Sequence, residues 1–263
     1  MLMTKVRVKV LGTLAAAGAL ALSTTPAMAA APSAPKPAPY TCTGGVIPSG
    51  SYSSLTVSGP CSVATGAQIT VGGNVNVGAG AVLDAQSAPS TITVGGNVTA
   101  LRGSFLGLGC QPPALTGNSA HVCADDPEGH SNISVGGNVT TTGAVAVLLN
   151  GITVGQNVTV SGGGSPEIPW SIKNNTIRGN ITVTGQTTTW LGVMFNRVGQ
   201  NVTLSNIKIT DPDPGAPGVY IVRNTINGNL TCVGLTPGVS GGFAPGSVNV
   251  VGRNATGQCA ALV

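Results

Sequence analysis

An eight-residue unit recurs along the chain: ITVGGNVT at residues 92–99 has near-copies that begin at Ile69, Ile133 and Ile152. Its asparagine falls at eight positions separated by 23, 41, 19, 23, 21, 28 and 25 residues: Asn74, Asn97, Asn138, Asn157, Asn180, Asn201, Asn229 and Asn254. Self-similarity at this period is typical of solenoids, in which each repeat forms one coil. The 41-residue step is either one coil with an insertion or two coils, one of them degenerate.

Each unit also alternates apolar and polar residues with the period of a β-strand. In ITV at residues 152–154 and NVTV at residues 157–160, isoleucine and valine would face the interior and threonine would face outward. Gly-Gly or Gly-Gln and then asparagine separate the two short strands. Glycine and asparagine suit a tight corner because they tolerate a positive φ better than most residues. Strand, corner and strand make one turn of a β-helix.

A single coil of this kind is unstable because it cannot bury its apolar face or pair its strand edges. Coils stacked about 4.8 Å apart pair each strand with its equivalents above and below. Valine then stacks on valine inside, and asparagine stacks on asparagine at the corner. We therefore predict an all-β chain that forms a single-stranded, right-handed parallel β-helix. Its roughly ten coils would take about 19–28 residues each.

The N-terminus has the pattern of a targeting segment. Three cations in the first nine residues precede an apolar run over residues 10–22, and AMA at residues 27–29 gives a small-residue cleavage site. We predict a signal peptide at residues 1–29, cleaved near Ala29 and Ala30. The mature protein would be secreted and extracellular.

After cleavage, residues 30–40 would form an extended Pro/Ala-rich leader and residues 41–263 the β-helix domain. The signal peptide carries three of the eleven Lys and Arg residues, so eight remain against seven Asp and Glu, a net charge of about +1. No cluster of cations remains to contact a phosphate backbone, so nucleic acid is not an expected partner. No later apolar stretch is long enough to predict a membrane span.

Six cysteines, all in the mature chain, predict disulfides in an exported protein. Many connectivities are possible, but the local spacing favours pairing of sequence neighbours: Cys42–Cys61, Cys110–Cys123 and Cys232–Cys259. The first and last pairs flank the repeats, where they would cap strand edges that otherwise invite aggregation. Because both ends would be closed in this way, we expect a monomer. We expect no cofactor, and no cysteine pair has the spacing of a zinc-binding CxxC motif.

The repeated V-G-x-N-V-x-V, the leader and the C-terminal GNLTC…VVGRNATGQCAAL together resemble secreted parallel β-helix proteins of actinobacteria. The resemblance covers most of the mature chain. It implies the fold and an extracellular location, and it implies no activity. The pectin-lyase-like enzymes share this architecture, which is an analogy of fold alone.

A polysaccharide lyase or glycoside hydrolase on this fold would need clustered carboxylates. Two carboxylates must flank a scissile bond, or a cation must neutralise a uronate. The mature chain has seven acids, and no two coils place them at equivalent strand positions: Asp84, Asp125, Asp126, Glu128, Glu167, Asp211 and Asp213. Asp211 and Asp213 alternate with prolines in DPDPG, which is typical of a turn. The pattern favours a non-catalytic protein.

The densest polar segment lies in an insertion at about residues 103–131. It holds both histidines and three of the seven acids, beside the expected Cys110–Cys123 bridge. Histidine and carboxylate are common metal ligands, so one interpretation is a metal site formed by His121, Asp125, Asp126, Glu128 and His130. The interpretation that we favour is a polar surface loop pinned by the disulfide.

Aromatic residues recur near one position of three consecutive coils: Trp170, Trp190 and Tyr220 lie ten, eleven and nine residues before a corner asparagine. Cations and amides lie nearby in the sequence: Lys173, Arg178, Arg197, Arg223, Asn175, Asn196 and Asn224. If this face is exposed, flat rings with amides and cations suit a sugar chain. If the rings point inward, they fill the core of a wide coil. The sequence leaves the two interpretations open.

Threonine two residues after most corner asparagines predicts an outward column: Thr99, Thr140, Thr159, Thr182, Thr203, Thr231 and Thr256. Ice-binding β-solenoids carry two threonine ranks on one flat face. Here a second rank is expected across the corner, interrupted by Ser134 and Arg197: Thr70, Thr93, Thr153, Thr176 and Thr225. We therefore interpret the column as β-propensity on a solvent-facing strand.

Two functions follow from these patterns. The favoured one is a rigid, non-catalytic extracellular protein, with a polysaccharide or cell-wall glycan as its partner on the aromatic column. Its candidate ligand-binding residues are Trp170, Trp190, Tyr220, Lys173, Arg197 and Arg223. The alternative is a polysaccharide lyase or glycoside hydrolase, which would be supported if the acids of the insertion folded over the aromatic column.

Overall fold

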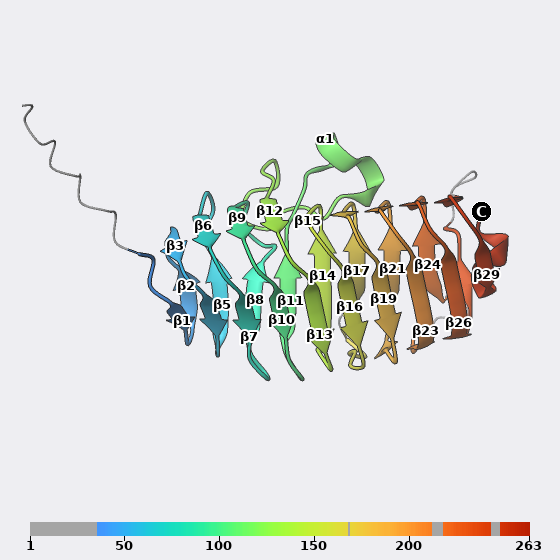
Figure 1. The fold of residues 1–263 in the computed structure, drawn as a ribbon, viewed down its shortest axis with the longest axis horizontal. Helices are drawn as coiled ribbons and strands as arrows, with labels where there is room; N and C mark the ends of the chain where they lie inside the picture. The colour runs from blue at the N-terminus through green and yellow to red at the C-terminus, as the bar shows by residue number, and fades with distance from the viewer. Residues whose placement is uncertain (1–35, 168, 212–217, 243–247) are drawn as a thin grey trace, which may run out of the picture. The chain divides into compact units, whose positions relative to one another are not determined.

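The computed structural model describes residues 36–167, 169–211, 218–242 and 248–263. The predicted signal peptide and residues 30–35 of the predicted leader lie outside these ranges. From residue 36 onward the chain forms a parallel β-helix whose coils stack one on the next (Figure 1). Neighbouring strands of the described part pair in parallel in all three sheets. The predicted fold class, a parallel β-helix, is confirmed.

Each coil contributes a strand to each of three sheets, A, B and C. Sheet A contains β1 (Tyr40–Cys42), β4 (Leu55–Val57), β7 (Val75–Val77), β10 (Val98–Ala100), β13 (Val139–Thr142), β16 (Val158–Ser161), β19 (Ile181–Thr184), β23 (Val202–Ile209), β26 (Leu230–Thr236) and β29 (Ala255–Gly257), with β20 (Thr187–Thr188) beside β23. Sheet B contains β2 (Gly45–Ile47), β5 (Pro60–Val63), β8 (Val82–Ala85), β11 (Phe105–Leu108), β14 (Ala146–Asn150), β17 (Trp170–Lys173), β21 (Leu191–Met194), β24 (Val219–Val222) and β27 (Val239–Ser240).

Sheet C has shorter strands toward the C-terminus. It contains β3 (Gly50–Tyr52), β6 (Gln68–Val71), β9 (Thr91–Val94), β12 (Asn132–Val135), β15 (Thr153–Val154), β18 (Thr176–Ile177), β22 (Arg197–Val198), β25 (Thr225–Ile226) and β28 (Val250–Val251). The helical segments of the described part are α1 (Pro113–Thr116), η1 (Gly117–Ser119) and η2 (Gln258–Ala261).

Like residues stack on like in the interior. One inward column of sheet A has side chains that are at most 2% exposed: Val75, Val98, Val139, Val158, Ile181, Val202 and Leu230. Burial of each such side chain contributes roughly 1.5–3 kcal/mol. Val98 pairs directly with Val139 across the 41-residue step, so this step is one coil with an insertion.

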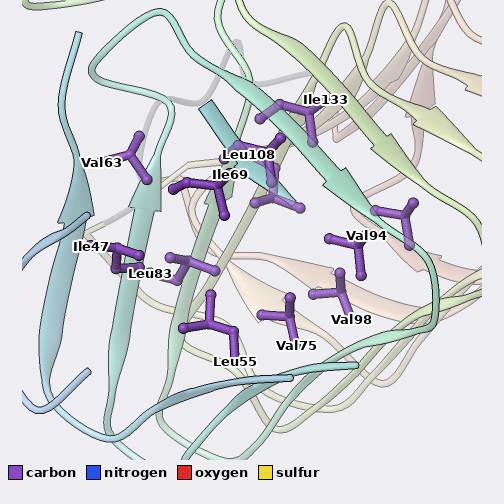
Figure 2. Close-up of a pocket in the computed structure, with 12 residues that line it drawn as sticks. Ile47, Leu55, Val63, Ile69, Val75, Leu83, Val94, Val98, Leu108 and Ile133 are labelled. Carbon is purple, nitrogen blue, oxygen red and sulfur yellow. The ribbon is translucent and has the colours of Figure 1, made fainter. Parts of the chain in front are cut away.

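An apolar cavity of about 20 Å³ lies between the sheets in the N-terminal coils (Figure 2). Leu55, Val75 and Val98 of sheet A meet Leu83 of sheet B there. Every lining side chain is aliphatic. The cavity therefore offers no hydrogen-bond partner to water or to a polar ligand, and it belongs to the core.

The asparagines at the corner between sheets C and A form a hydrogen-bonded column, the outer ladder. The Oδ1 atom of each asparagine accepts a hydrogen bond from the main-chain N of the next, at 2.8–3.1 Å from Asn74 to Asn254. A Cβ atom at Gly96 or Gly137 would overlap the Oδ1 atom of the asparagine one coil earlier. This overlap explains why glycine so often precedes asparagine in the repeat, and the expected ladder is confirmed.

The disulfides join the cysteines as predicted: Cys42–Cys61, Cys110–Cys123 and Cys232–Cys259. The first bridge ties β1 to β5, and the last ties β26 to η2. The middle bridge closes the insertion. The two outer bridges therefore lie at the two ends of the stack, where strands have a neighbour on one side only.

Candidate functional site

Two aromatic side chains lie together on the outer face of sheet B. Tyr220 belongs to β24, and its partner on β21 is Gly192. Trp190 lies just before β21, with its indole over Gly192. The ring centroids of Trp190 and Tyr220 are 5.3 Å apart with the planes inclined at 34°, and both side chains are partly exposed. We call this pair the Trp190–Tyr220 platform.

Gly192 makes room for the platform. A Cβ atom at this position would overlap the indole ring of Trp190 and crowd the terminal methyl of Met194. The indole therefore packs down on the strand beside Met194. A ring that is already packed loses little conformational entropy when a ligand binds, which favours recognition.

Trp170 does not belong to the platform. Its side chain is fully buried, and its Nε1 donates a hydrogen bond to the Val145 carbonyl at 2.9 Å. Its strand partner is Leu191, so Trp170 and Trp190 are offset by one residue. Because side chains alternate between the faces of a strand, this offset sends Trp170 into the core. The structure corrects the interpretation of Trp170 as a ligand-binding residue on an exposed column of three rings.

The asparagines that precede the corner by five residues also lie inside. Asn175, Asn196 and Asn224 are each 1% exposed. With Asn249 they form a second column, the inner ladder, in which each Oδ1 accepts from the Nδ2 of the asparagine before it at 2.9–3.0 Å. The interpretation of these amides as donors to sugar hydroxyls is therefore wrong.

The three predicted cations do not lie on one face. Lys173 is on the outer face of sheet B, where its Nζ donates to the Ala120 carbonyl at 2.9 Å and burial lowers its pKa. Arg223 directly follows β24 and is exposed at the corner after sheet B. Arg197 is exposed on β22 of sheet C, where it borders a shallow depression with Arg178. Lys173 and Arg223 therefore belong to the side of the platform, and Arg197 belongs to a different sheet.

The insertion follows β11, packs on sheet B and bonds to the coil of β17, two coils further along the stack. Asn174 donates from Nδ2 to the Ser119 carbonyl and accepts at Oδ1 from the Ser119 hydroxyl, both at 2.9 Å. His121 forms an isolated backbone bridge with Gln111. Burial is the main cause that lowers the pKa of His121, Lys173 lowers it further, and Asp84 opposes them. The insertion is thus a docked segment with a histidine on its inner side.

The predicted metal ligands are dispersed. Asp126 and His130 border one shallow depression together with Gln68 and Thr91 of sheet C, whereas His121 lies near Lys173. The Asp125 main chain donates to the Ser87 carbonyl, and Glu128 is exposed. Among the residues that the structure describes, no group of three or more His, Cys, Asp or Glu side chains is placed to hold a metal ion.

The acids of the insertion lie several coils before the platform. Asp126 is next to Gln68 and Thr91, which belong to β6 and β9, whereas Trp190 and Tyr220 belong to the coils of β21 and β24. These acids therefore do not fold over the aromatic rings, which is the arrangement that would support a lyase or a hydrolase.

The sequence did not predict that Gly192 and Met194 lie beside Trp190, or that Phe195 forms the corner that follows. Phe195 is partly exposed and has a φ of 57°, and it follows Met194 at the tight corner after β21. The signal was present in WLGVMF at residues 190–195, where a glycine lies two residues after a tryptophan and so on the same face of the strand. Glycine in a strand often marks a place where another group approaches closely.

None of the helices in the described ranges has the length and apolar character needed to cross a membrane. Compared with known proteins, the chain matches no family model, no curated protein and no solved structure. Its fold and bridges define the class of protein: a parallel β-helix with disulfides at both ends of the stack.

Proposed function

We propose that the protein is a rigid, non-catalytic, secreted β-helix that binds a glycan chain at the Trp190–Tyr220 platform. The observation that carries the proposal is the pair of packed, partly exposed rings, 5.3 Å apart on one sheet face. Aromatic faces pack well against the C–H faces of pyranose rings. Arg223, exposed at the adjoining corner, supplies donors for hydroxyl or acidic groups of the chain.

The rest of the fold supports a structural role for such a binder. Two asparagine ladders and three disulfides hold the coils in register. Disulfides form and persist in oxidising compartments, which supports export of the protein. A rigid stack presents the platform with little loss of conformational entropy on binding.

The test is co-sedimentation of the mature protein with insoluble polysaccharides and cell walls. We expect at least one glycan to retain the protein, and we expect Trp190→Ala combined with Tyr220→Ala to abolish retention. The matched control is Tyr52→Ala, which removes one ring of the Tyr40–Tyr52 pair, whose centroids are 5.0 Å apart at the other end of the stack. Far-UV circular dichroism confirms that each variant is folded.

Retention that survives in the double variant, or no retention by any glycan, would contradict the proposal. Product-release assays on a retained glycan separate simple binding from the lyase or hydrolase alternative. Turnover by the native protein would replace the non-catalytic assignment.

A further inference from the structure

The outer face of sheet A carries two parallel ranks of hydroxyl side chains. The first rank pairs in register on β13, β16, β19 and β23: Thr140, Thr159, Thr182 and Thr203. The second rank lies two residues further along the same strands: Thr142, Ser161, Thr184 and Ser205. We call these eight residues the hydroxyl array.

The second rank was not expected from the sequence. The threonines predicted to form it, such as Thr153 and Thr176, lie on sheet C as anticipated, around the corner from the first rank. The serines at positions 161 and 205 conceal the true second rank, because a search for threonine alone passes over them. Sheet A therefore carries two ranks of hydroxyl residues on one face, which is the arrangement that the sequence did not predict.

Tight corners hold both sides of the hydroxyl array. Before the first rank runs the outer ladder, with Oδ1 to N distances of 2.9–3.1 Å between Asn138 and Asn201. Directly after the second rank comes a residue with a positive φ, which ends three of the strands at Gly143, Gly162 and Gly185 and lies within β23 at Asn206. Between these corners the four strands pair residue for residue. The array is therefore held in register and rigid.

The array repeats in two directions. Neighbouring strands are about 4.8 Å apart, and residues two positions apart on one strand are about 6.7 Å apart. Water oxygens on the prism face of hexagonal ice repeat over similar distances in two perpendicular directions. A rigid surface with this double repeat can hold water molecules in positions that continue into an ice lattice.

The chemistry of the array suits a neutral, periodic ligand. The four strand segments VTTT, VTVS, ITVT and VTLS contain no charged residue. Within the described part of the chain, the hydroxyls of Thr140, Thr159 and Thr182 bond to no protein group, while Ser205 donates to Thr184 at 3.0 Å. Threonine is β-branched, so its methyl and hydroxyl groups have few accessible rotamers. The surface thus offers fixed hydroxyls to water and fixed methyl groups between them.

We propose that the hydroxyl array is an ice-binding face. The ligand is the ordered water of an ice surface, bound by the threonine and serine hydroxyls of the four coils from β13 to β23. The array lies on sheet A and the Trp190–Tyr220 platform lies on sheet B, so the two proposals involve different residues and fail independently.

The test is partition of the disulfide-intact mature protein into slowly growing ice, together with thermal hysteresis. We expect the native protein to be enriched in the ice and to shape ice crystals. Thr159→Tyr combined with Thr182→Tyr should abolish both effects, because two large rings lift the array from the ice. The matched control is Thr153→Tyr combined with Thr176→Tyr, which places the same substitutions on sheet C of the same coils. The control should keep both effects.

A second pair of variants covers the case in which tyrosine unfolds a coil. Thr159→Val combined with Thr182→Val keeps the branched shape and removes two hydroxyls, and it should lower enrichment relative to Thr153→Val combined with Thr176→Val. Two results would overturn the proposal: exclusion of the native protein from ice, or equal behaviour of the face and control variants. If ice excludes the protein, retention by a crystalline polysaccharide that depends on Thr159 and Thr182 would identify a different ligand for this face.

Discussion

One position of the coil holds isoleucine in four successive coils and asparagine in the next four. The register of sheet C aligns Ile69, Ile92 and Ile133, and Ile152 continues this isoleucine column just before β15. The following coils place the inner ladder there: Asn175, Asn196, Asn224 and Asn249. All of these side chains are buried. A single interior column therefore changes from aliphatic side chains to amides within one continuous stack.

The change follows the length of the connection between sheets B and C in most coils; Ile152, after a short connection, and Asn249, after a long one, are the exceptions. In the N-terminal part, β8 ends at Ala85 and β9 begins at Thr91, so the chain has room to turn and then to form a four-residue strand. In the C-terminal part, β21 ends at Met194 and β22 begins at Arg197, and β22 has only two residues. The shorter connection turns through a residue with a positive φ, as at Phe195.

The short corner removes main-chain partners, and asparagine replaces them. Asn196 accepts at Oδ1 from the main-chain N of Asn175 at 3.1 Å, and its Nδ2 donates to the Ile172 carbonyl at 2.8 Å and to Asn224. Ile69, Ile92 and Ile133 lie in four-residue strands that pair along the main chain, whereas the main-chain N of Ile152, beside a two-residue strand, already donates to Asn175. The difference teaches that an amide column substitutes for part of a strand where the corner is tight.

The largest loss of stability should come from placing an asparagine in the isoleucine column. Ile92→Asn would lose an aliphatic contact and bury an amide between Ile69 and Ile133, neither of which offers it a partner. We expect a loss of about 5 kcal/mol in the free energy of unfolding, the sum of the burial and unpaired-amide costs. Urea denaturation followed by circular dichroism measures it.

Ile152→Asn is the matched comparison. The main-chain N of Ile152 already donates to Asn175 Oδ1 at 2.9 Å, so an asparagine there could extend the inner ladder by one step. We expect it to cost less than half as much as Ile92→Asn. Equal losses at the two positions would show that the presence of a hydrogen-bond partner for the amide does not decide between isoleucine and asparagine.

Removing one asparagine from each ladder compares the two columns directly. Asn196→Ala in the inner ladder leaves the Asn175 main-chain N and the Ile172 carbonyl unpaired in the core, at a cost of about 3 kcal/mol. Asn201→Ala in the outer ladder removes the Nδ2 donor to Asn180 and the Oδ1 acceptor of the Asn229 main-chain N, but water can reach that corner, so we expect about 1 kcal/mol. Urea midpoints with unchanged slopes would support the ranking, and a larger loss for Asn201→Ala would reverse it.

These ladders also show what the sequence can and cannot predict. The outer ladder follows from the repeat itself, because its asparagine lies in a motif that recurs with glycine before it and valine after it. Asn175, Asn196 and Asn224 were also visible at a constant spacing, but side-chain direction at a corner depends on φ. The positive φ of the preceding residue, found at Asn174, Phe195 and Arg223, is not encoded by a glycine in this chain.

The candidate site was predictable to the same limited degree. The proximity of Trp190 and Tyr220 follows from their similar place in consecutive coils. Trp170 was grouped with them because its distance from the corner asparagine differs from theirs by only one residue. In a strand, a shift of one residue turns a side chain to the opposite face. The positions of His121 and Asp126 depend on the path of an insertion that no repeat constrains.

The insertion bridges the two parts of the stack, and acid should weaken it. It follows β11 and bonds to Lys173 and Asn174 of the first coil that has the inner ladder. The pKa of His121 is lowered from 6.5 by burial and by Lys173. Below about pH 6.5 the unfolded chain therefore binds a proton at His121 more readily than the folded chain does, so stability falls as the pH decreases through this range.

Urea midpoints near pH 7.5 and near pH 5 test this dependence. We expect the drop for the native protein to exceed the drop for His121→Gln. The control is His130→Gln, the exposed histidine of the same insertion. If both variants keep the full drop, the acid sensitivity arises outside His121.

The smallest effect concerns a threonine that lies where the stack elsewhere has aliphatic residues. Thr141 is fully buried on β13, between Ala100 and Val160 of the neighbouring strands. Its hydroxyl has no hydrogen-bond partner among the described residues. Thr141→Val keeps the branched shape and removes the unpaired hydroxyl, so it should stabilise the fold by about 1 kcal/mol.

Thr140→Val on the exposed side of the same strand is the control and should change stability little. A loss of stability in Thr141→Val would mean that its hydroxyl has a partner in solution, such as a buried water, and that the interior column is less uniformly apolar than its packing indicates.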